Sequence, residues 1–443
     1  MCGIVGFVGK QGNKEQILDD MMKVIIHRGP DSAGKYVNDQ VALGFRRLSI
    51  IDLENGSQPM FNEDGEVGIV FNGEIYNSPE LRERFLAKGH VFKNSSDTET
   101  LIHGYEEYGE KLVHELRGMF GFAIWDNKKK RLFMARDFFG IKPVYYAMIR
   151  GNLVFASEIK SILEFPGFKK EVNNEALEEY LSFQYSNLTE TFFKGVYRLL
   201  PGHYLTYQNG ELNVTQYFDP TLEPVSKDSQ EELVKKLTDV LEDSVDKHML
   251  ADVEVGAFLS SGVDSSYIAA KYSGKKTFTV GFFDKNNQYS ETQYAEECAK
   301  FLGLENYSHQ ITEEEYWGEM PKIMYHMDEP LADPAAIALY FVAREAAKQV
   351  KVVTSGEGAD EFFGGYTIYR EPLSLRWISW LPKSWRKSMA NLAEKLPEGM
   401  KGRSYIIRAS KSVEERFIGN ANIFTEEERK KLLKIKTNAP SPE

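Results

Sequence analysis

The sequence is poor in cysteine, in long apolar runs and in basic charge. Only Cys2 and Cys298 occur among its 443 residues, so the fold is not expected to rest on disulfides, and a reducing compartment fits best. No apolar run approaches the roughly 20 residues that span a bilayer, and the N-terminus lacks the basic region of a signal peptide. The 66 Asp and Glu outnumber the 54 Lys and Arg, and this net charge of −12 argues against a nucleic-acid scaffold. We therefore expect a soluble, cytoplasmic protein that binds neither membranes nor nucleic acid.

Histidine is also scarce. The eight histidines are scattered, and no two stand at the i, i+4 spacing of a helical metal site, so a zinc site is not expected. Cys298 lies in the predicted helix YAEECAKFLG and is expected to be an ordinary core residue.

The first two hundred residues predict an α+β domain with packed sheets. Helical spacing of apolar residues occurs at about 14–25, 79–88 and 98–108, and Ser78-Pro79 is typical of a helix start. Between these helices stand short runs rich in β-branched and aromatic residues, which predict strands. These runs are CGIVGFVG, VGIVFNGEIYN, MFGFAIWD, RLFMARD, PVYYAMI and LVFASEI.

Residues 216–232 divide the chain. This stretch is acidic, contains two prolines and has few apolar residues, which predicts an exposed linker. Beyond it, strands such as VEVGAFL and KTFTVGFF alternate with helices, which indicates an α/β domain with a mainly parallel sheet. We expect a first domain at 1–215 and a second at 233–443.

Three of the five tryptophans, Trp377, Trp380 and Trp385, lie together in RWISWLPKSW among basic residues. An interfacial membrane helix would have a similar pattern. We favour a buried or partner-facing helix near Pro382.

Cys2 follows the initiator Met and is a candidate nucleophile. A small second residue normally permits removal of that Met, which would give Cys2 a free α-amine. Such an amine has a pKa of about 7.7–8.0, so it can accept the thiol proton without a histidine. A cysteine that begins an apolar strand is often only structural, and the neighbouring motifs must decide.

Four further segments supply groups that hydrolysis of a side-chain amide requires. HRGPDS and FRRLSI place arginines in short polar turns, where a guanidinium can clamp a carboxylate. Asn72-Gly73 offers an amide beside a glycine N–H as an oxyanion hole, and Asp97 offers a carboxylate to an ammonium group. Each segment alone could be a turn or a helix cap; together they favour a glutaminase.

MCGIVGF, RGPDS, RLSI, NGEIYN and SDTE, in this order, resemble the class II glutamine amidotransferase domain. The resemblance implies an N-terminal-nucleophile fold, a four-layer αββα sandwich. It also implies that Cys2 attacks glutamine while Asn72 and the Gly73 N–H hold the oxyanion. Glutamine would be bound by the following residues: Arg47, Leu48, Ile50, Glu74 and Asp97.

Two motifs in the second half suggest a phosphate site. SSGVDSS joins a strand to a helix, and its hydroxyls and backbone N–H groups can cradle a pyrophosphate. Asp264 within it would repel phosphate unless Mg²⁺ lies between them. SGEGADE ends another apolar strand with three acidic residues, which indicates metal coordination or proton transfer. An ordinary strand-to-helix turn and a solvated acidic loop are the alternatives.

This pair of loops resembles the ATP-pyrophosphatase domain of the asparagine synthetase family. The resemblance implies that ATP adenylates the side-chain carboxylate of aspartate and that ammonia from the first domain displaces AMP. It places Glu357 at the adenylation step and Asp264 and Asp360 on Mg²⁺-pyrophosphate. The implied ATP-binding residues are Leu259, Ser260, Ser261, Gly262, Asp264, Ser265, Val280, Ser355 and Gly356.

Two departures from the family pattern are visible. Ser261 replaces the second residue of the usual SGGxDS loop, which is tolerable only if its φ is negative. The second domain, 233–443, is expected to be incomplete at its C-terminus. Two alternatives stay open: ATP-dependent amidation of another carboxylate, and a glutaminase or binding module with an inactive synthetase half. A homodimer is expected only from the family.

Overall fold

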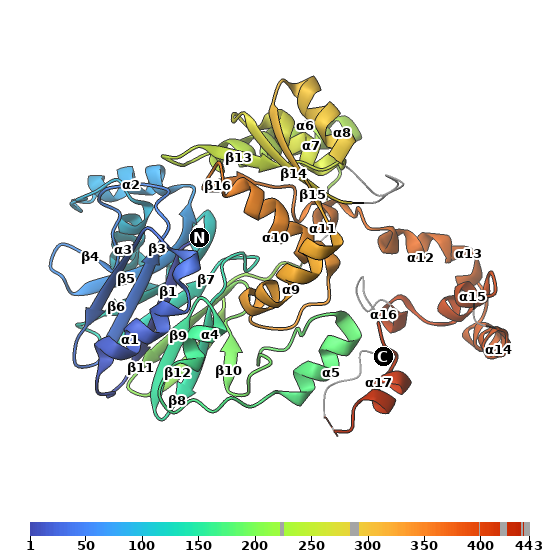
Figure 1. The fold of residues 1–443 in the computed structure, drawn as a ribbon, viewed down its shortest axis with the longest axis horizontal. Helices are drawn as coiled ribbons and strands as arrows, with labels where there is room; N and C mark the ends of the chain where they lie inside the picture. The colour runs from blue at the N-terminus through green and yellow to red at the C-terminus, as the bar shows by residue number, and fades with distance from the viewer. Residues whose placement is uncertain (222–225, 284–291, 398, 417–422, 436, 438–443) are drawn as a thin grey trace.

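The computed structural model describes residues 1–221, 226–283, 292–397, 399–416, 423–435 and 437. The N-terminal half forms two antiparallel sheets, and the following residues form a separate parallel sheet with helices (Figure 1).

The first N-terminal sheet has the strand order β10-β8-β9-β1-β3-β2, and every neighbouring pair is antiparallel. Its strands are β1 (Gly3–Val8), β2 (Ser32–Val37), β3 (Val41–Arg47), β8 (Tyr145–Ile149), β9 (Asn152–Ala156) and β10 (Val196–Arg198). β1 lies in the middle, so the residue before it is held at the centre of one sheet edge.

The second sheet has the order β12-β11-β7-β6-β5-β4 and is also antiparallel. Its strands are β4 (Met60–Phe61), β5 (Val67–Ile75), β6 (Gly118–Asp126), β7 (Arg131–Arg136), β11 (His203–Gln208) and β12 (Glu211–Gln216). All six strands expected from sequence are confirmed among the two sheets.

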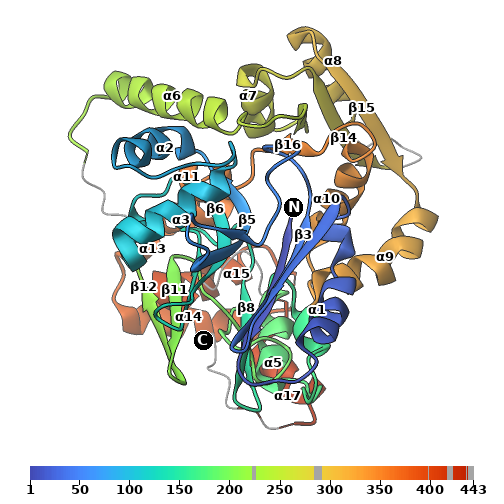
Figure 2. The ribbon, with the colours of Figure 1, turned by 90° about the vertical axis from the view of Figure 1, so that its left-hand side faces the viewer.

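Apolar side chains join the sheets into a four-layer sandwich. Between the sheets, Leu43 and Phe45 of β3 pack with Val70 of β5 and Trp125 of β6. One outer face is covered by α1 (Lys14–Lys23) and α4 (Ile159–Leu163), and the other by α2 (Ser78–Ala87) and α3 (Asp97–Tyr108). Figure 2 shows α3 and α1 on opposite sides of the sheets. The expected αββα architecture is confirmed.

The expected helices agree with α1, α2 and α3 to within two residues. Two details differ. The N-cap of α2 is Asn77, with Ser78 already helical. Arg47, expected in a polar turn, is the last residue of β3, because β3 pairs with β1 up to Arg46 and with β2 up to Arg47.

The C-terminal part contains the parallel sheet β15-β14-β13-β16. Its strands are β13 (Val255–Phe258), β14 (Lys276–Phe282), β15 (Glu305–Ile311) and β16 (Val352–Thr354). Its helices are α6 (Gln230–Lys247), α7 (Val263–Lys271), α8 (Thr292–Leu302), α9 (Glu313–Met327), α10 (Pro334–Ala346) and α11 (Ala359–Phe363). Ala269 of α7 and Ala299 of α8 belong to one core cluster, and Val342 of α10 belongs to another with Phe278 of β14. The expected α/β domain is confirmed.

The last helices extend to the right of the molecule in Figure 1. They are α12 (Glu371–Ser374), α13 (Arg376–Ser379), α14 (Lys383–Ala393), α15 (Arg403–Ser410), α16 (Val413–Arg416) and α17 (Glu426–Leu432); α5 (Asn174–Phe183) contacts α17. Trp377, Trp380 and Trp385 are all largely exposed, so the expectation of burial is wrong, whereas that of a partner-facing segment stays a prediction. Within the described residues, no helix has the length and apolar character needed to cross a bilayer.

Candidate active sites

The thiol of Cys2 lies just before β1 and beside the end of β3. The backbone N–H of Leu48 points at the sulfur at 3.4 Å, and the sulfur lies 3.6 Å from the Leu48 carbonyl oxygen. From the other side, Nε of Arg28 donates to the Cys2 carbonyl at 2.9 Å. Arg28 lies in the short 3-10 helix Ile26–Arg28, so two separate segments fix the position of Cys2.

Burial controls the proton affinities around this thiol. Burial raises the pKa of the Cys2 thiol, although the Leu48 N–H and the charges of Arg47 and Arg28 act in the opposite direction. Burial also lowers the pKa of the N-terminal amine of Met1 to about 5 and that of Lys142 to about 8. A neutral amine beside a protonated thiol is the arrangement that permits proton transfer from sulfur to nitrogen.

Asn72 and Gly73 lie inside β5, opposite β6. Asn72 is 1% exposed, and its Nδ2 has no hydrogen-bond partner among the described residues. A Cβ at Gly73 would lie 2.1 Å from the carbonyl oxygen of Met119, so the approach of β6 requires glycine here. A buried amide donor without a partner carries a free-energy cost of about 1–3 kcal/mol, which a bound acceptor would relieve. This position therefore suits a developing oxyanion.

Two buried carboxyl groups, Glu74 and Asp97, lie near one another. Burial and then the charge of Asp97 raise the pKa of Glu74 to about 7. Burial raises the pKa of Asp97 to about 6, while the Ile75 N–H donates to its Oδ2 at 2.9 Å. Asp97 is placed by the start of α3, where Ser96 caps the helix by accepting from the Thr98 N–H. A cation between these carboxyls would relieve their repulsion, as an α-ammonium group would.

Arg47 is 6% exposed and binds the loop that follows it. Its Nη1 donates to the carbonyl of Leu53 at 3.1 Å, and its Nη2 to those of Ile51 and Asp52 at 3.2 and 2.5 Å. The guanidinium thus shapes the loop 48–53. The carbonyl of Ile50 in this loop accepts from the Asp252 N–H at 3.0 Å, which connects the loop to the C-terminal part.

Sequence reasoning missed an ion-pair network behind Cys2. Nη1 of Arg28 and Nε2 of His27 both lie 2.9 Å from Oε1 of Glu158. Lys160 pairs with Glu158 and, at 2.8 Å, with Asp328 of the C-terminal part. Although burial acts to raise it, the His27 hydrogen bond and the charges of Arg28 and Lys160 lower the pKa of Glu158 to about 2. No local pattern indicates this network, because Glu158 is 130 residues away from Arg28.

A second candidate site lies at the carboxyl edge of the parallel sheet. β13 ends at Phe258, and the loop Leu259–Gly262 leads into the N-terminus of α7. The hydroxyls of Ser260 and Ser265 lie 2.8 Å apart, and the Gly262 N–H donates to Ser260 Oγ at 3.1 Å. Ser261 is not among the described residues with positive φ, so its replacement of glycine introduces no backbone strain.

The SGEGADE loop adjoins this loop because β13 and β16 are parallel neighbours. A Cβ at Gly356 would lie 3.1 Å from Cβ of Asp264, so the two loops approach closely at that point. Glu357 is exposed and lies just before α11, and Asp360 lies in the first turn of α11. Val280 lies in the neighbouring β14, and Thr279 Oγ1 donates to the Leu259 carbonyl at 2.8 Å. The expected ATP residues thus lie on neighbouring strands and on the loops after them.

Comparison with known proteins agrees with this two-part organisation. Residues 1–218 match the family model for the glutamine amidotransferase domain, and residues 236–437 match that for asparagine synthase. Asparagine synthetase [glutamine-hydrolyzing] 1 of Bacillus subtilis is 47% identical over 98% of this chain and 70% of its own length. A putative asparagine synthetase [glutamine-hydrolyzing] of Mycobacterium bovis is 42% identical over 98% of this chain and 71% of its own.

A third relative, amidase chyE of Penicillium rubens, is 34% identical over 91% of this chain and 65% of its own length. Identity of 47% across nearly the whole chain, with both domain families in the expected order, establishes the relationship. The chain belongs to the family of glutamine-hydrolysing asparagine synthetases.

Proposed function

We propose that the protein makes asparagine from aspartate, ATP and glutamine in the cytoplasm. The observation that carries this proposal is the presence of two sites on one chain. The N-terminal part holds the Cys2 thiol and the unpartnered amide donor of Asn72, and two phosphate-type loops adjoin in the C-terminal part.

In the first reaction, the Cys2 sulfur attacks the side-chain carbonyl of glutamine and passes its proton to a neutral amine. After removal of Met1, that amine is the α-amine of Cys2 itself. Asn72 Nδ2 and the Gly73 N–H stabilise the oxyanion, ammonia leaves with a proton, and water releases glutamate from the thioester. The buried, unpartnered state of Asn72 Nδ2 supports this role.

We assign the α-ammonium of glutamine to Glu74 and Asp97, because both carboxyls are buried and the charge of Asp97 acts on Glu74, a repulsion that a bound cation would relieve. Arg47 holds the α-carboxylate and shapes the loop that carries Leu48 and Ile50, which line the same pocket. The carbonyl contacts of Arg47 fix its guanidinium in one orientation, which supports a positioning as well as a binding role.

In the second reaction, the aspartate side-chain carboxylate attacks the α-phosphorus of ATP and pyrophosphate leaves. Ammonia then attacks the acyl adenylate and AMP leaves. Ser260, Ser261, Gly262 and Ser265 would cradle the pyrophosphate through hydroxyls and the N-terminus of α7, and Glu357 would act during adenylation. Leu259, Val280, Ser355 and Gly356 would contact the rest of the nucleotide.

Mg²⁺ would supply charge neutralisation between the pyrophosphate and the acidic groups. Asp264 and Asp360 are the residues that would hold it, since both are carboxylates at the edge where the two loops lie. Ammonia passes between the sites inside the protein. The contacts of Asp52 with Asp252 and of Lys160 with Asp328 support this, because they fix the two parts against each other. A homodimer is the proposed assembly.

The test is product analysis of the full chain supplied with glutamine, aspartate and Mg²⁺-ATP. We expect asparagine and pyrophosphate in equal amounts, with at least as much glutamate. Glutamate alone would refute the synthetase half of the proposal. The assay should include other carboxylic acids as acceptors, because a relative carries the name of an amidase rather than of a synthetase.

A further inference from the structure

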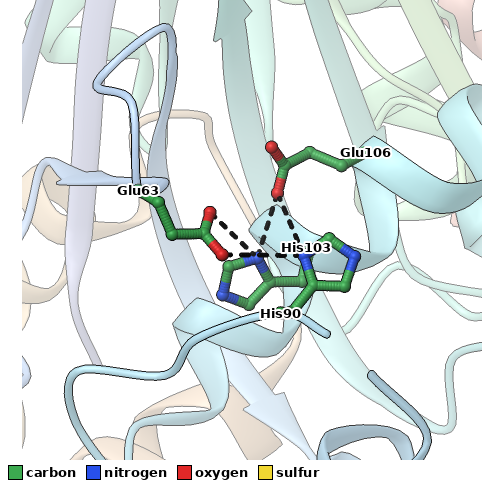
Figure 3. A group of neighbouring side chains, drawn as sticks. All are labelled: Glu63, His90, His103 and Glu106. Carbon is green, nitrogen blue, oxygen red and sulfur yellow. Dashed lines mark hydrogen bonds and ion pairs between the residues drawn. The ribbon is translucent and has the colours of Figure 1, made fainter. Parts of the chain in front are cut away.

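Two histidines and two glutamates gather on the outer face of the N-terminal sandwich (Figure 3). Glu63 lies in the turn between β4 and β5, His90 follows α2, and His103 and Glu106 lie on α3. The four side chains offer one ligand atom each, and these atoms all lie within 4.8 Å of one another.

The spacing of these atoms is close to that of a tetrahedral metal site. Nδ1 of His103 lies 3.0 Å from Glu106 Oε2 and 3.7 Å from Glu63 Oε2. Nδ1 of His90 lies 3.7 Å from both Glu63 Oε1 and Glu106 Oε2. Ligands at about 2.0–2.1 Å from a tetrahedral zinc ion stand about 3.4 Å apart. These four separations differ from that value by a few tenths of an ångström, and the other two pairs, whose atoms lie within 4.8 Å, would have to close by at most about 1.4 Å.

Neighbouring groups orient three of the four ligands as they do in metal sites, whereas Nε2 of His103 lies 4.0 Å from Glu99 Oε1 and has no hydrogen-bond partner among the described residues. Nε2 of His90 lies 3.1 Å from Oε1 of Glu107, which leaves Nδ1 directed at the cluster. Asn62 Nδ2 donates to Oε1 of Glu106 at 2.6 Å, and the Val91 N–H donates to Oε1 of Glu63 at 3.0 Å. A carboxylate or amide behind each ligand is the usual second layer of a zinc site, where it fixes the ring or carboxylate orientation.

The cluster is anchored inside the protein but open toward solvent. The side chain of His103 is 0% exposed and that of His90 is 15% exposed, whereas Glu63 and Glu106 are 35% and 26% exposed. The buried histidines fix the site, and the more exposed glutamates leave a path for an ion to enter. Two imidazoles and two carboxylates also balance the charge of a divalent ion.

We infer that Glu63, His90, His103 and Glu106 form a structural site for a divalent transition-metal ion, with zinc as the best match. Such an ion links the β4–β5 turn and the α2–α3 loop to α3. Because the same helix α3 carries Asp97 at its N-terminus, the ion stabilises the helix that places this residue. The inference rests on the geometry of these side chains alone and is independent of the proposed reaction.

The inference differs from the expectation that zinc ligands are absent. That expectation rested on histidine spacing along the chain, and His90 and His103 are 13 positions apart. The turn after α2 folds His90 back onto α3 and brings the two rings to a centroid distance of 4.6 Å.

The test uses the full chain with Cys2→Ala, so that the nucleophilic thiol cannot capture the metal. The protein is stripped with a chelator, dialysed against Zn²⁺ and analysed by mass spectrometry of the bound metal and by thermal unfolding. We expect one equivalent of zinc and a higher Tm with zinc than without it. Co²⁺ in place of Zn²⁺ should give the visible absorption of a tetrahedral site.

Variants separate a metal site from a cluster of ion pairs. Glu106→Gln and His90→Ala should each weaken zinc binding at least tenfold and abolish the zinc-dependent part of the Tm, and Glu107→Gln should weaken it less. His203→Ala, the matched change at a half-buried histidine outside the cluster, should leave both zinc affinity and the zinc-dependent part of the Tm unchanged. The inference is wrong if the parent binds no stoichiometric zinc, or if His90→Ala and Glu106→Gln bind it as tightly as the parent.

Discussion

Replacement of Asn72 by alanine tests the proposed role of its side-chain amide as an oxyanion donor in glutamine hydrolysis. The Asn72 side chain is 1% exposed and its Nδ2 has no partner among the described residues, so its removal breaks no described hydrogen bond of that nitrogen. The backbone pairing of Asn72 with Gly121 across β5 and β6 does not involve the side chain. The variant should therefore fold normally.

The magnitude follows from the role assigned to this amide. Loss of one preorganised oxyanion donor lowers kcat by about 10²–10³, or about 2.7–4 kcal/mol of transition-state stabilisation. Removal of a buried amide without a partner relieves about 1–3 kcal/mol of desolvation cost, and the lost packing offsets this gain. We expect a large loss of kcat for glutamine with little change in KM or in stability.

Glutaminase activity is measured as glutamate release, and the urea midpoint of unfolding is measured beside it. Ammonia-dependent synthesis of asparagine is the internal control and should keep the parent rate. Asn72→Asp, which keeps the shape but offers an acceptor in place of the donor, should lose as much kcat as Asn72→Ala. Parent-like kcat in both variants would refute the oxyanion role of Asn72.

Further expected results concern the ammonium pocket, the ion-pair network and the nucleotide loops. Because burial raises the pKa of Glu74 to about 7 and that of Asp97 to about 6, lowering the pH from about 8 to about 5 should raise KM for glutamine. A KM independent of pH would contradict the assignment of the α-ammonium group to Glu74 and Asp97. A raised pKa in the folded state also means that stability falls as the pH rises from about 4.5 to about 7, and Glu74→Gln should remove the part of this slope that Glu74 contributes and leave the part that Asp97 contributes. Glu158→Gln removes the carboxylate partner of the buried Arg28, although Lys160 keeps Asp328, and should cost about 3–5 kcal/mol in urea unfolding, whereas an unchanged midpoint would show that the network is dispensable. Gly356→Val places a side chain against Asp264 and should abolish ATP-dependent synthesis but preserve glutaminase activity; retained synthesis would disprove the close approach of the loops.

The sequence predicted the strands and helices of this fold better than the order of the strands within each sheet. The runs GIVGFV and RLFMAR have the apolar composition of buried strands, so β1 and β7 could be predicted from the local sequence. Their neighbours in the sheets come from distant segments: β1 pairs with β9, about 150 residues away. Such pairings depend on tertiary packing, which no local pattern encodes.

The residues of the candidate sites likewise divide into those that lie in local motifs and those that only tertiary packing brings together. Cys2, Asn72 and Asp97 lie in short motifs and could be proposed from sequence, whereas Lys142 and Glu158 could not, because their importance comes only from burial beside the Cys2 site. The cluster around His103 was missed for the same reason. The tryptophan segment is a different case: its apolar content favoured a buried or partner-facing helix, and the structure contradicts burial because Trp377, Trp380 and Trp385 are all exposed.

The most direct test of the two-site account is a paired assay of Cys2→Ala in the full chain. Asparagine, glutamate and pyrophosphate are followed with glutamine and, separately, with ammonia as the nitrogen source. The account predicts no glutamate and no glutamine-dependent asparagine, together with undiminished asparagine and pyrophosphate from ammonia. Equal loss of both activities, or glutamate release that survives the substitution, would contradict it.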